Sequence, residues 1–388
     1  MKKKIAILGS TGSIGKSLLK IIKKNKNDNF QILLLTANSN YKELLNQTKI
    51  FKVKNVIIQN NLSYEKFKKI NKNKNLKIYN NFNNLNKIFK TKIDYLMNSI
   101  VGIDGLDPTL KIIKHTKNLA IANKEAIICG WNLINKKLKK HKTNFIPVDS
   151  EHFSIRYAIK NTEIKNIDKI YLTASGGPLL NFSTRRINNV SIKDVLKHPT
   201  WKMGQKISVD SSTMMNKVFE VIEAKNIFGL KLNKISILIH PNSYVHAIIN
   251  FNDGMIKVIA HETTMDIPIF NTLYKDSNKK YKTKKINLNL LNHLNLSDIN
   301  KKKFPILKLL TKIPQNISLY ETVIVSANDE LVRRYLNGEI KYRDISKKLL
   351  KILNLKEFIK LKKTIPSKIS EIINLDKYVR LKIKSKSV

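Results

Sequence analysis

The sequence contains a single cysteine, Cys129, among 388 residues. One thiol excludes a framework of internal disulfides and a zinc site built from cysteines, and it is typical of a reducing compartment. Long apolar runs are also missing, because stretches such as 32–35 and 235–239 are far shorter than the roughly 18 residues of a membrane span. The amino-terminal apolar run stops at Gly9, too early for a secretory signal. We therefore expect a soluble, cytoplasmic protein with no membrane partner.

Acidic residues are scarce as well. Lysine and arginine number 73 and aspartate and glutamate 28, which gives a formal net charge of +45. Such a charge attracts polyanions, so a non-enzymatic polyanion-binding protein is the main alternative to an enzyme. The lysines are spread along the chain with asparagine and isoleucine, as in 71–90, and zinc-finger, RNP-like and basic-zipper patterns are absent. Compositional drift at tolerant surface positions explains the charge better, and we expect no specific nucleic-acid partner.

The amino-terminal part has the pattern of a βαβ unit. An apolar run at 2–8 breaks at a glycine-rich stretch, a helical pattern covers 16–24, and a second strand is predicted at 31–37. Further apolar segments predict strands at 55–59 and 95–102 and a strand that leads into a helix at 119–130. This alternation predicts an α/β fold with a parallel sheet.

The composition changes near Asn144, after which serine, threonine, histidine and carboxylates become more frequent. From residue 301 onward, leucine, isoleucine and valine recur at helical spacing. We therefore predict four segments: an α/β domain at 1–148, a second domain at 149–275, a connector at 276–300 and a helical domain at 301–388.

The stretch GSTGSIG (9–15) is suited to binding a phosphate. Glycines let backbone N–H groups approach an anion, and the start of the following helix favours negative charge. The spacing excludes a P-loop, which needs four residues between its glycines. A dinucleotide is therefore the better interpretation. Because the spacing also departs from the usual G-x-G-x-x-G, the motif alone leaves the cofactor and the reaction open.

Two carboxylates, Asp149 and Glu151, stand two positions apart beside an apolar strand. On an extended segment both would point to the same side and could hold a hard cation through oxygen atoms. A solvated acidic pair is the ordinary alternative, but a close pair is unusual in a chain with so few acids.

A helical run within 208–229 is predicted to present polar side chains from one face. Residue types that cap helices come first, namely Asp210, Ser211 and Ser212. The shared face then carries Asn216, Glu220 and Glu223, with Lys217 beside it. Such a helix could bind a phosphorylated, metal-chelated substrate, and an ordinary capped helix with exposed charges is equally compatible with the pattern.

Two stretches rich in turn residues follow the acidic pair, SGGP (175–178) and HPTWKMG (198–204). A Ser-Gly-Gly turn can form an anion nest, and the second stretch has the composition of a lid. A lone His198 or Trp201 is nevertheless more often structural, and we predict structural roles for His240 and His246.

Together these motifs resemble the 1-deoxy-D-xylulose 5-phosphate reductoisomerase family. Seven strings match in the family's order: GSTGSIG (9–15), ANKE (122–125), PVDSEH (147–152), SGGP (175–178), HPTWKMG (198–204), KISVDSSTMMNK (206–217) and IHPNS (239–243). The string SANDELVRRYLNGEI (326–340) matches more weakly. The resemblance implies a Rossmann-like parallel-sheet domain, a central α+β catalytic domain and a C-terminal helical bundle, usually in a homodimer.

The resemblance also implies roles for individual residues. The metal ligands would be Asp149, Glu151 and Glu220, and the catalytic residues would be these three with Lys124 and His198. The residues that bind a small sugar phosphate would be Lys124, Ser150, Glu151, Ser175, His198, Ser211, Asn216, Lys217 and Glu220, with the phosphate near Ser175, Ser211, Asn216 and Lys217. The residues that bind NADPH would be Thr11, Gly12, Ser13, Ile14, Asn38, Ser39, Asn40, Asn123, Glu125 and Gly204. Trp201 would belong to a flap over the substrate.

The implied reaction is a metal-dependent rearrangement of 1-deoxy-D-xylulose 5-phosphate and its reduction by NADPH to 2-C-methyl-D-erythritol 4-phosphate, in non-mevalonate isoprenoid synthesis. Oxygen ligands suit Mg²⁺ or Mn²⁺ as the Lewis acid. Another NAD(P)-dependent oxidoreductase with the same first domain is a lesser alternative, which a substrate panel would separate.

Two positions depart from the family's pattern. Ser39 stands where some members have a basic residue, which would pair with the 2′-phosphate of NADPH, so a preference over NADH rests on the resemblance. Thr264-Met265-Asp266 stands where the family tends to have Asp-Met-Arg, which reverses the local charge.

Overall fold

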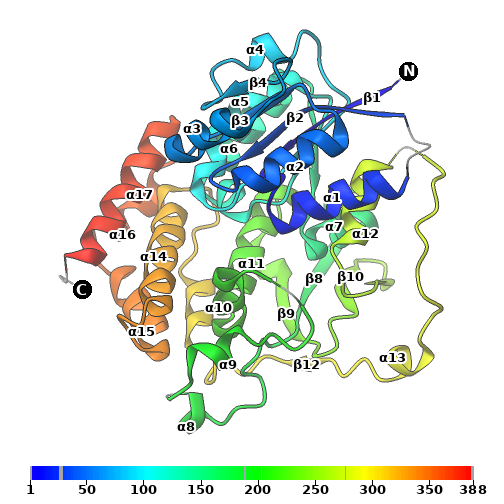
Figure 1. Ribbon diagram of the computed structural model, residues 1–388. Helices are drawn as coiled ribbons and strands as arrows, with labels where there is room; N and C mark the ends of the chain where they lie inside the picture. The colour runs from blue at the N-terminus through cyan, green and yellow to red at the C-terminus, as the bar shows by residue number, and fades with distance from the viewer. Residues whose placement is uncertain (1, 26–28, 188, 202, 276, 386–388) are drawn as a thin grey trace. The chain divides into compact units, whose positions relative to one another are not determined.

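The computed structural model describes residues 2–25, 29–187, 189–201, 203–275 and 277–385, so Lys202 of the HPTWKMG stretch lies outside the described residues (Figure 1). The chain forms two compact units, one of Met1–Ala126, Leu133–Asp149 and Met265–Lys282, the other of Ile127–Asn132, Ser150–Thr264 and Thr283–Val388. The division into four segments stays a prediction. Within the described ranges no helix is both long enough and apolar enough to cross a membrane.

The first unit is built on a seven-stranded sheet in which neighbouring strands pair in parallel. The spatial order of the strands is β4-β3-β2-β1-β5-β6-β7. Their bounds are β1 (Lys3–Leu8), β2 (Phe30–Ala37), β3 (Asn55–Ile58), β4 (Lys77–Tyr79), β5 (Tyr95–Asn98), β6 (Asn118–Ile121) and β7 (Asn144–Pro147). The predicted parallel sheet is confirmed.

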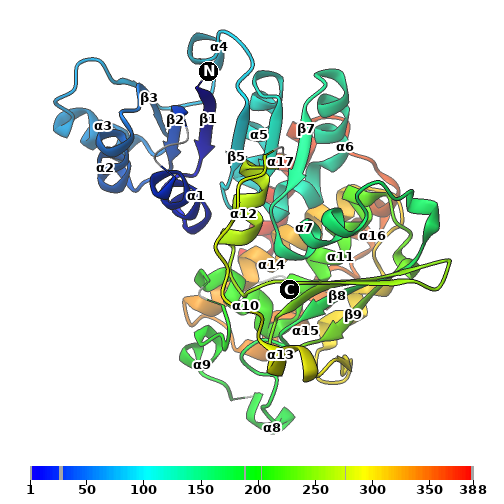
Figure 2. The same ribbon diagram turned by 90° about the vertical axis from the view of Figure 1, so that its right-hand side faces the viewer.

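Helices connect these strands and cover the sheet (Figures 1 and 2). They are α1 (Ser13–Lys24), α2 (Tyr41–Phe51), α3 (Asn61–Ile70), α4 (Leu85–Ile88), α5 (Leu106–Ile112) and α6 (Lys124–Lys140). Helix α12 (Asp266–Leu273) comes from much later in the chain and packs against α1. Its Ile269, Phe270 and Leu273 are buried in one apolar cluster with Ile5 and Ile7 of β1.

The strand order reverses between β1 and β5, which lie side by side. Ligands of open parallel sheets bind at the carboxyl ends of the strands next to such a switch point. The glycine-rich turn 9–15 follows β1, and Ser99 follows β5. The predicted phosphate-binding turn therefore lies where this fold places its ligand.

The second unit contains a five-stranded sheet in the order β11-β10-β8-β9-β12. Strands β8 and β9, visible side by side in Figure 2, pair in parallel, and the other pairs are antiparallel. The bounds are β8 (Ile167–Ala174), β9 (Ile235–Ile239), β10 (Val245–Phe251), β11 (Ile256–Ala260) and β12 (Ser297–Asp298). Helix α7 (Ser150–Ala158) packs on β10 and β11, and α11 (Met215–Phe228) packs on β8 and β9. The sheet thus supports both helices that carry predicted site residues.

A helical bundle completes this unit, as predicted for the residues after 301. Helix α14 (Leu319–Leu336) packs against α15 (Tyr342–Ile352) and α17 (Ile369–Lys384), and it also contacts α10 (Gln205–Thr213) (Figure 1). Shorter helices are α8 (Thr184–Ile187), α9 (Ile192–Leu196), α13 (Leu288–Asn292) and α16 (Lys356–Lys360). The parallel-sheet part, the α+β part and the helical part confirm the expected fold class.

The predicted capping by Asp210, Ser211 and Ser212 is wrong. These residues lie in the last turns of α10, and α11 begins only after Met214, whose φ of 67° ends the first helix. The hydroxyl of Ser212 donates to the carbonyl oxygen of Val209 at 2.7 Å. Serine can satisfy its hydroxyl in this way inside a helix, so its presence does not by itself mark a helix start.

Candidate active site

The turn after β1 has a backbone conformation that requires glycine at two positions, because a Cβ atom at either would clash with neighbouring main-chain atoms. Gly9 has a φ of +76°, and a Cβ there would lie 2.9 Å from the main-chain oxygen of Ser99. A Cβ on Gly15 would lie 2.5 Å from the Cα of Ser10. Gly12, the N-cap of α1, offers no side chain to the first N–H groups of the helix. Those N–H groups are therefore open to an anion such as a phosphate.

The other predicted cofactor residues near this turn lie at the carboxyl ends of neighbouring strands. Gly12 and Ser13 are exposed and Thr11 and Ile14 half-buried after β1, and Asn38–Asn40 are exposed after β2. The side chain of Asn40 accepts a hydrogen bond from the N–H of α2 residue Glu43. The two strands are adjacent and parallel, so both segments line the same edge of the sheet.

Asn123 and Glu125, also predicted to bind the cofactor, are both buried. The side-chain oxygen of Asn123 accepts a hydrogen bond from the N–H of Ala126 at 2.8 Å, and its amide donates to the carbonyl oxygen of Gly102 at 2.8 Å. Asn123 thereby caps α6 and fixes the start of the helix that carries Lys124. Gly204 belongs to the second unit, where it is the N-cap of α10.

Three carboxylates converge at the start of α7. Asp149, Glu151 and Glu220 each offer an oxygen atom, and these atoms lie within 4.8 Å of one another. Asp149 is bonded to Ser150, the first residue of α7, so its place beside Glu151 follows from the chain itself. The predicted extended segment is wrong, because the chain enters a helix at Ser150. Aspartate and serine are residue types that favour a helix start, and the pair converges with Glu220 all the same.

Lys217 lies between two of these carboxylates. Its Nζ is 2.8 Å from Glu151 Oε1 and 2.5 Å from Glu220 Oε2, and it donates to the main-chain oxygen of Thr173 at 2.6 Å. Asn216 donates to Glu220 at 2.5 Å. Burial would lower the pKa of Lys217, but attraction and hydrogen bonds from the two glutamates outweigh it, so the net shift of the pKa is upward. The ammonium group stays charged and offsets the repulsion between the carboxylates.

The donor set fits a hard divalent cation. All three donors are carboxylates, which Mg²⁺ and Mn²⁺ prefer, and no thiol or imidazole belongs to this group. Lys124 lies 2.5 Å from Asp149, as Lys217 does from Glu220. Three carboxylates and two ammonium groups leave one negative charge in excess, which favours the approach of a cation.

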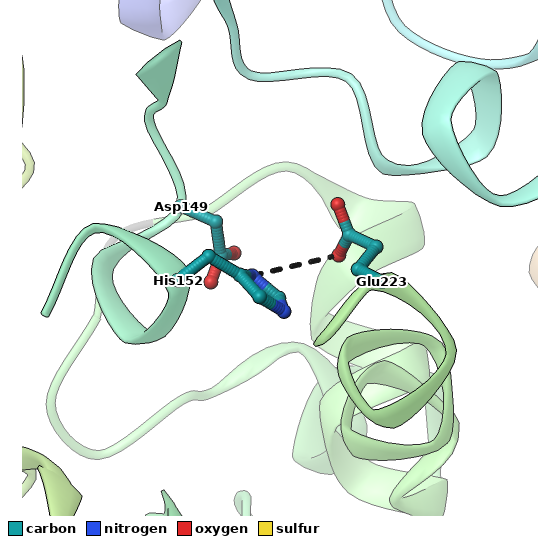
Figure 3. Close-up of side chains that lie close together, drawn as sticks. All are labelled: Asp149, His152 and Glu223. Atoms are coloured by element: carbon teal, nitrogen blue, oxygen red, sulfur yellow. Dashed lines mark ion pairs between the residues drawn. The ribbon is translucent and has the colours of Figure 1, made fainter. Parts of the chain in front are cut away.

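A second group shares Asp149 and lies directly behind the first. Asp149, His152 and Glu223 also offer atoms within 4.8 Å of one another, and Figure 3 shows the His152 ring facing Glu223. Nδ1 of His152 is 3.9 Å from Glu223 Oε2, and Nε2 is 2.9 Å from the main-chain oxygen of Glu220. The ring therefore ties α7 to α11. Helical spacing predicts Glu223 on this helix face, whereas the sequence pattern gives His152 no role, although it directly follows Glu151 in the sequence.

Three other predicted substrate residues form a separate cluster. Nε2 of His198 is 3.2 Å from the hydroxyl of Ser175 and 3.1 Å from that of Ser211. Nδ1 of His198 accepts a hydrogen bond from the N–H of Trp201 at 3.0 Å, so the neutral ring carries its proton on Nε2. Burial lowers the pKa of His198 to about 4. The predicted substrate set thus falls into a carboxylate–lysine cluster and a neutral histidine–serine cluster.

Trp201, from the predicted flap, rests on a pair of histidines. Its ring meets His246 edge-on with centroids 6.2 Å apart, and His246 stacks on His261 at 3.7 Å. Burial lowers the pKa of His261, which favours the neutral form of that ring.

Comparison with known protein families gives three matches along the chain. Residues 5–130 match the profile described as 1-deoxy-D-xylulose 5-phosphate reductoisomerase, and residues 145–228 match its C-terminal domain. Residues 261–382 match a further profile described as DXP reductoisomerase C-terminal domain.

Curated relatives and solved structures agree with these matches. The 1-deoxy-D-xylulose 5-phosphate reductoisomerase of Pelagibacter ubique is 57% identical over 388 residues and the full length of both chains, and that of Wolbachia pipientis wMel is 39% identical over 88% of each chain. A crystal structure of DOX-P reductoisomerase with NADPH, fosmidomycin and magnesium has a TM-score of 0.91 at 32% identity, covering 99% of this chain and 98% of that one. The Zymomonas mobilis enzyme with NADPH has a TM-score of 0.88 at 29% identity over both full chains.

We expect His198 to remain uncharged at neutral pH. With a pKa near 4, its ring nitrogens should keep their neutral ¹⁵N chemical shifts from pH 8 down to about pH 5, whereas in the urea-unfolded chain the ring should titrate near 6.5. The folded state then binds this proton less readily than the unfolded state. The contribution of His198 to the free energy of unfolding is therefore intact above about pH 6.5 and is lost as the pH falls toward 4. A midpoint near 6.5 in the folded protein would contradict this assignment.

Proposed function

The chain belongs to the 1-deoxy-D-xylulose 5-phosphate reductoisomerase family, and from that premise we propose that it converts 1-deoxy-D-xylulose 5-phosphate to 2-C-methyl-D-erythritol 4-phosphate with NADPH and a divalent cation. The observation that carries this proposal is the convergence of three carboxylates, two of which share the ammonium group of Lys217. Such a group is expected of an enzyme that must hold a metal ion and an anionic sugar together.

Asp149, Glu151 and Glu220 are the residues we propose to hold the cation. When bound, a divalent cation supplies Lewis-acid polarisation of a carbonyl oxygen. Lys217 and Lys124 keep the carboxylates together in its absence and offer ammonium groups to the oxygen atoms of the substrate. Asn216 orients Glu220 by its hydrogen bond. Ser150 is buried at the start of α7 beside Glu151, to which its hydroxyl donates at 2.6 Å.

The histidine–serine cluster is suited to the phosphate of the substrate. Ser175 and Ser211 can donate hydroxyl hydrogens, and His198 can donate from Nε2 while remaining neutral. Uncharged donors bind a phosphate without adding to the positive charge already present at Lys217. Trp201, seated on the histidine pair, would cover the substrate and exclude water.

NADPH is the proposed hydride donor. Its phosphates would bind the turn formed by Thr11–Ile14, with Gly12 and the start of α1 supplying N–H groups, and its adenosine end would lie at Asn38–Asn40. Ser39 can hydrogen-bond a 2′-phosphate but adds no charge to it. Asn123, Glu125 and Gly204 complete the proposed cofactor set, with Asn123 in a supporting role.

We also propose that the protein is cytoplasmic and works as a homodimer. Strand β11 forms one edge of the second sheet, and its neighbourhood exposes Met255, Ile256 and Val258 at 66%, 57% and 47%. An edge strand with apolar side chains is a natural surface for pairing with a second copy.

The primary test is NADPH oxidation with 1-deoxy-D-xylulose 5-phosphate. We expect turnover with Mg²⁺ or Mn²⁺, loss of turnover after chelation and recovery when the metal is restored. A panel of other hydroxyketones and aldehydes separates this activity from other NAD(P)-dependent oxidoreductases. Turnover of another substrate, or turnover that is insensitive to chelation, would refute the proposal.

Two sets of residues share Asp149, one with Glu151 and Glu220 and the other with His152 and Glu223. Matched variants on α11 show which set binds the cation. Glu220→Gln should lower kcat at least 100-fold, because the proposed cation loses a charged ligand, while circular dichroism and NADPH affinity stay unchanged. Glu223→Gln, one turn further on, should keep kcat within about tenfold, because it acts through His152. The reverse order of effects would assign the metal to the second group.

The dimer can be tested with a charge on the edge strand. Ile256→Lys should convert the protein to a monomer in sedimentation velocity, since a lysine on an edge strand opposes pairing with another strand. Leu62→Lys, at a 74% exposed position on α3, is the matched control and should leave the oligomeric state unchanged. A wild-type protein that sediments as a monomer would contradict the proposal directly.

A further inference from the structure

The C-terminal string SANDELVRRYLNGEI (326–340) runs from α14 into the turn that follows it, and two of its residues on α14 face α10. Asn328 donates a hydrogen bond from its amide to Asp210 Oδ1 at 2.7 Å. Both side chains are buried, Asn328 completely and Asp210 to within 2% exposure. A buried carboxylate that receives a hydrogen bond from another helix is held in one orientation.

Charged side chains extend this contact in both directions. Nζ of Lys206 lies 3.2 Å from Asp210 and 2.9 Å from Asp329, the neighbour of Asn328. Arg380 of α17 lies 3.3 Å from Asp329 and binds Asp376 at 2.8 Å. The helical bundle is thus joined to α10 by a continuous polar network with alternating charge.

The other end of this network adjoins the histidine–serine cluster. Asp210 is followed directly by Ser211, whose hydroxyl lies 3.1 Å from His198. The main chain of Ser211 also packs closely on the SGGP loop, because a Cβ on Gly177 would lie 2.7 Å from the oxygen of Ser211. Any rotation of the last turn of α10 would therefore move Ser211 against both His198 and the loop.

We propose that Asn328 is a positioning residue for the sugar phosphate, acting through Asp210 on Ser211, and that Asp329 supports it through Lys206. This inference rests on the proposed function, since it assigns a role toward the phosphate of that substrate. Asp210 already has a cationic partner in Lys206, so the need for a positive charge does not by itself explain Asn328. The amide of Asn328 instead provides a directional hydrogen bond, which fixes the oxygen atom of Asp210 that faces α14. The same bond thereby restrains the rotation of the last turn of α10.

Asn328→Asp provides the direct test, because it keeps the shape of the side chain and replaces the donor with a carboxylate facing Asp210. We expect the KM for 1-deoxy-D-xylulose 5-phosphate to rise at least tenfold, with the KM for NADPH within twofold of wild type. Asn328→Ala, which adds no charge, should raise the same KM three- to tenfold and covers the case in which the aspartate variant does not fold.

A reversed pair separates positioning from general destabilisation. The double variant Asp210→Asn with Asn328→Asp exchanges donor and acceptor, and it should recover most of the lost substrate affinity. Val323→Ala is the control: it removes buried volume from α14 five residues earlier, about 140° round the helix. It should lower the melting temperature without changing either KM by more than twofold.

The outcomes divide clearly. The proposal is overturned if the KM for the sugar phosphate stays unchanged in both Asn328 variants, if both KM values rise together, or if the reversed pair is no better than Asn328→Asp alone. Equal effects of Val323→Ala and Asn328→Ala on the KM for the sugar phosphate would overturn it as well. If the wild-type protein does not turn over the substrate, the proposed function fails and this inference fails with it.

Discussion

Repulsion between carboxylates is the constraint that this structure has to satisfy. Glu151 and Glu220 come from different helices, and each is largely removed from water, so their approach would be unfavourable without a cation. Lys217 supplies that charge from within α11 and is itself fixed by the carbonyl oxygen of Thr173 at the end of β8. The charge balance of this group therefore depends on the sheet beneath it, and the helices on that sheet set the distance between the two carboxylates.

The same logic explains why α7 and α11 are joined so tightly. Helix α7 lies on β10 and β11 and α11 on β8 and β9, and His152 connects them by binding the main chain of Glu220. A hydrogen bond to the main chain fixes the helix itself, while the side chain of Glu220 faces Lys217. The ring thus helps to set the positions of the carboxylates on the two helices.

Much of this arrangement follows from local sequence patterns. The alternating apolar runs and the glycine turn predicted the parallel sheet, and helical spacing placed Asn216, Glu220 and Glu223 on one face of α11. The capping interpretation of Asp210–Ser212 failed because serine hydroxyls can bond inside a helix, so the break at Met214 has no clear local signature. Contacts between distant segments, such as Asn328 with Asp210, depend on how helices pack, and residue types alone do not encode them.

The scarcity of acids gains a meaning once the buried pairs are considered together. Asp149 pairs with Lys124, Asp210 with Lys206 and Glu321 with Lys225, so several of the few carboxylates are inside the protein with a lysine at each. Even the reversed charge at Asp266 is met by Lys20 on α1, at 3.7 Å. Since Lys20 is 60% exposed, that pair contributes little stability, and it compensates the departure mainly by avoiding an unpaired charge. The large positive charge is therefore carried mainly by exposed lysines, whereas several of the few carboxylates are buried beside a lysine partner.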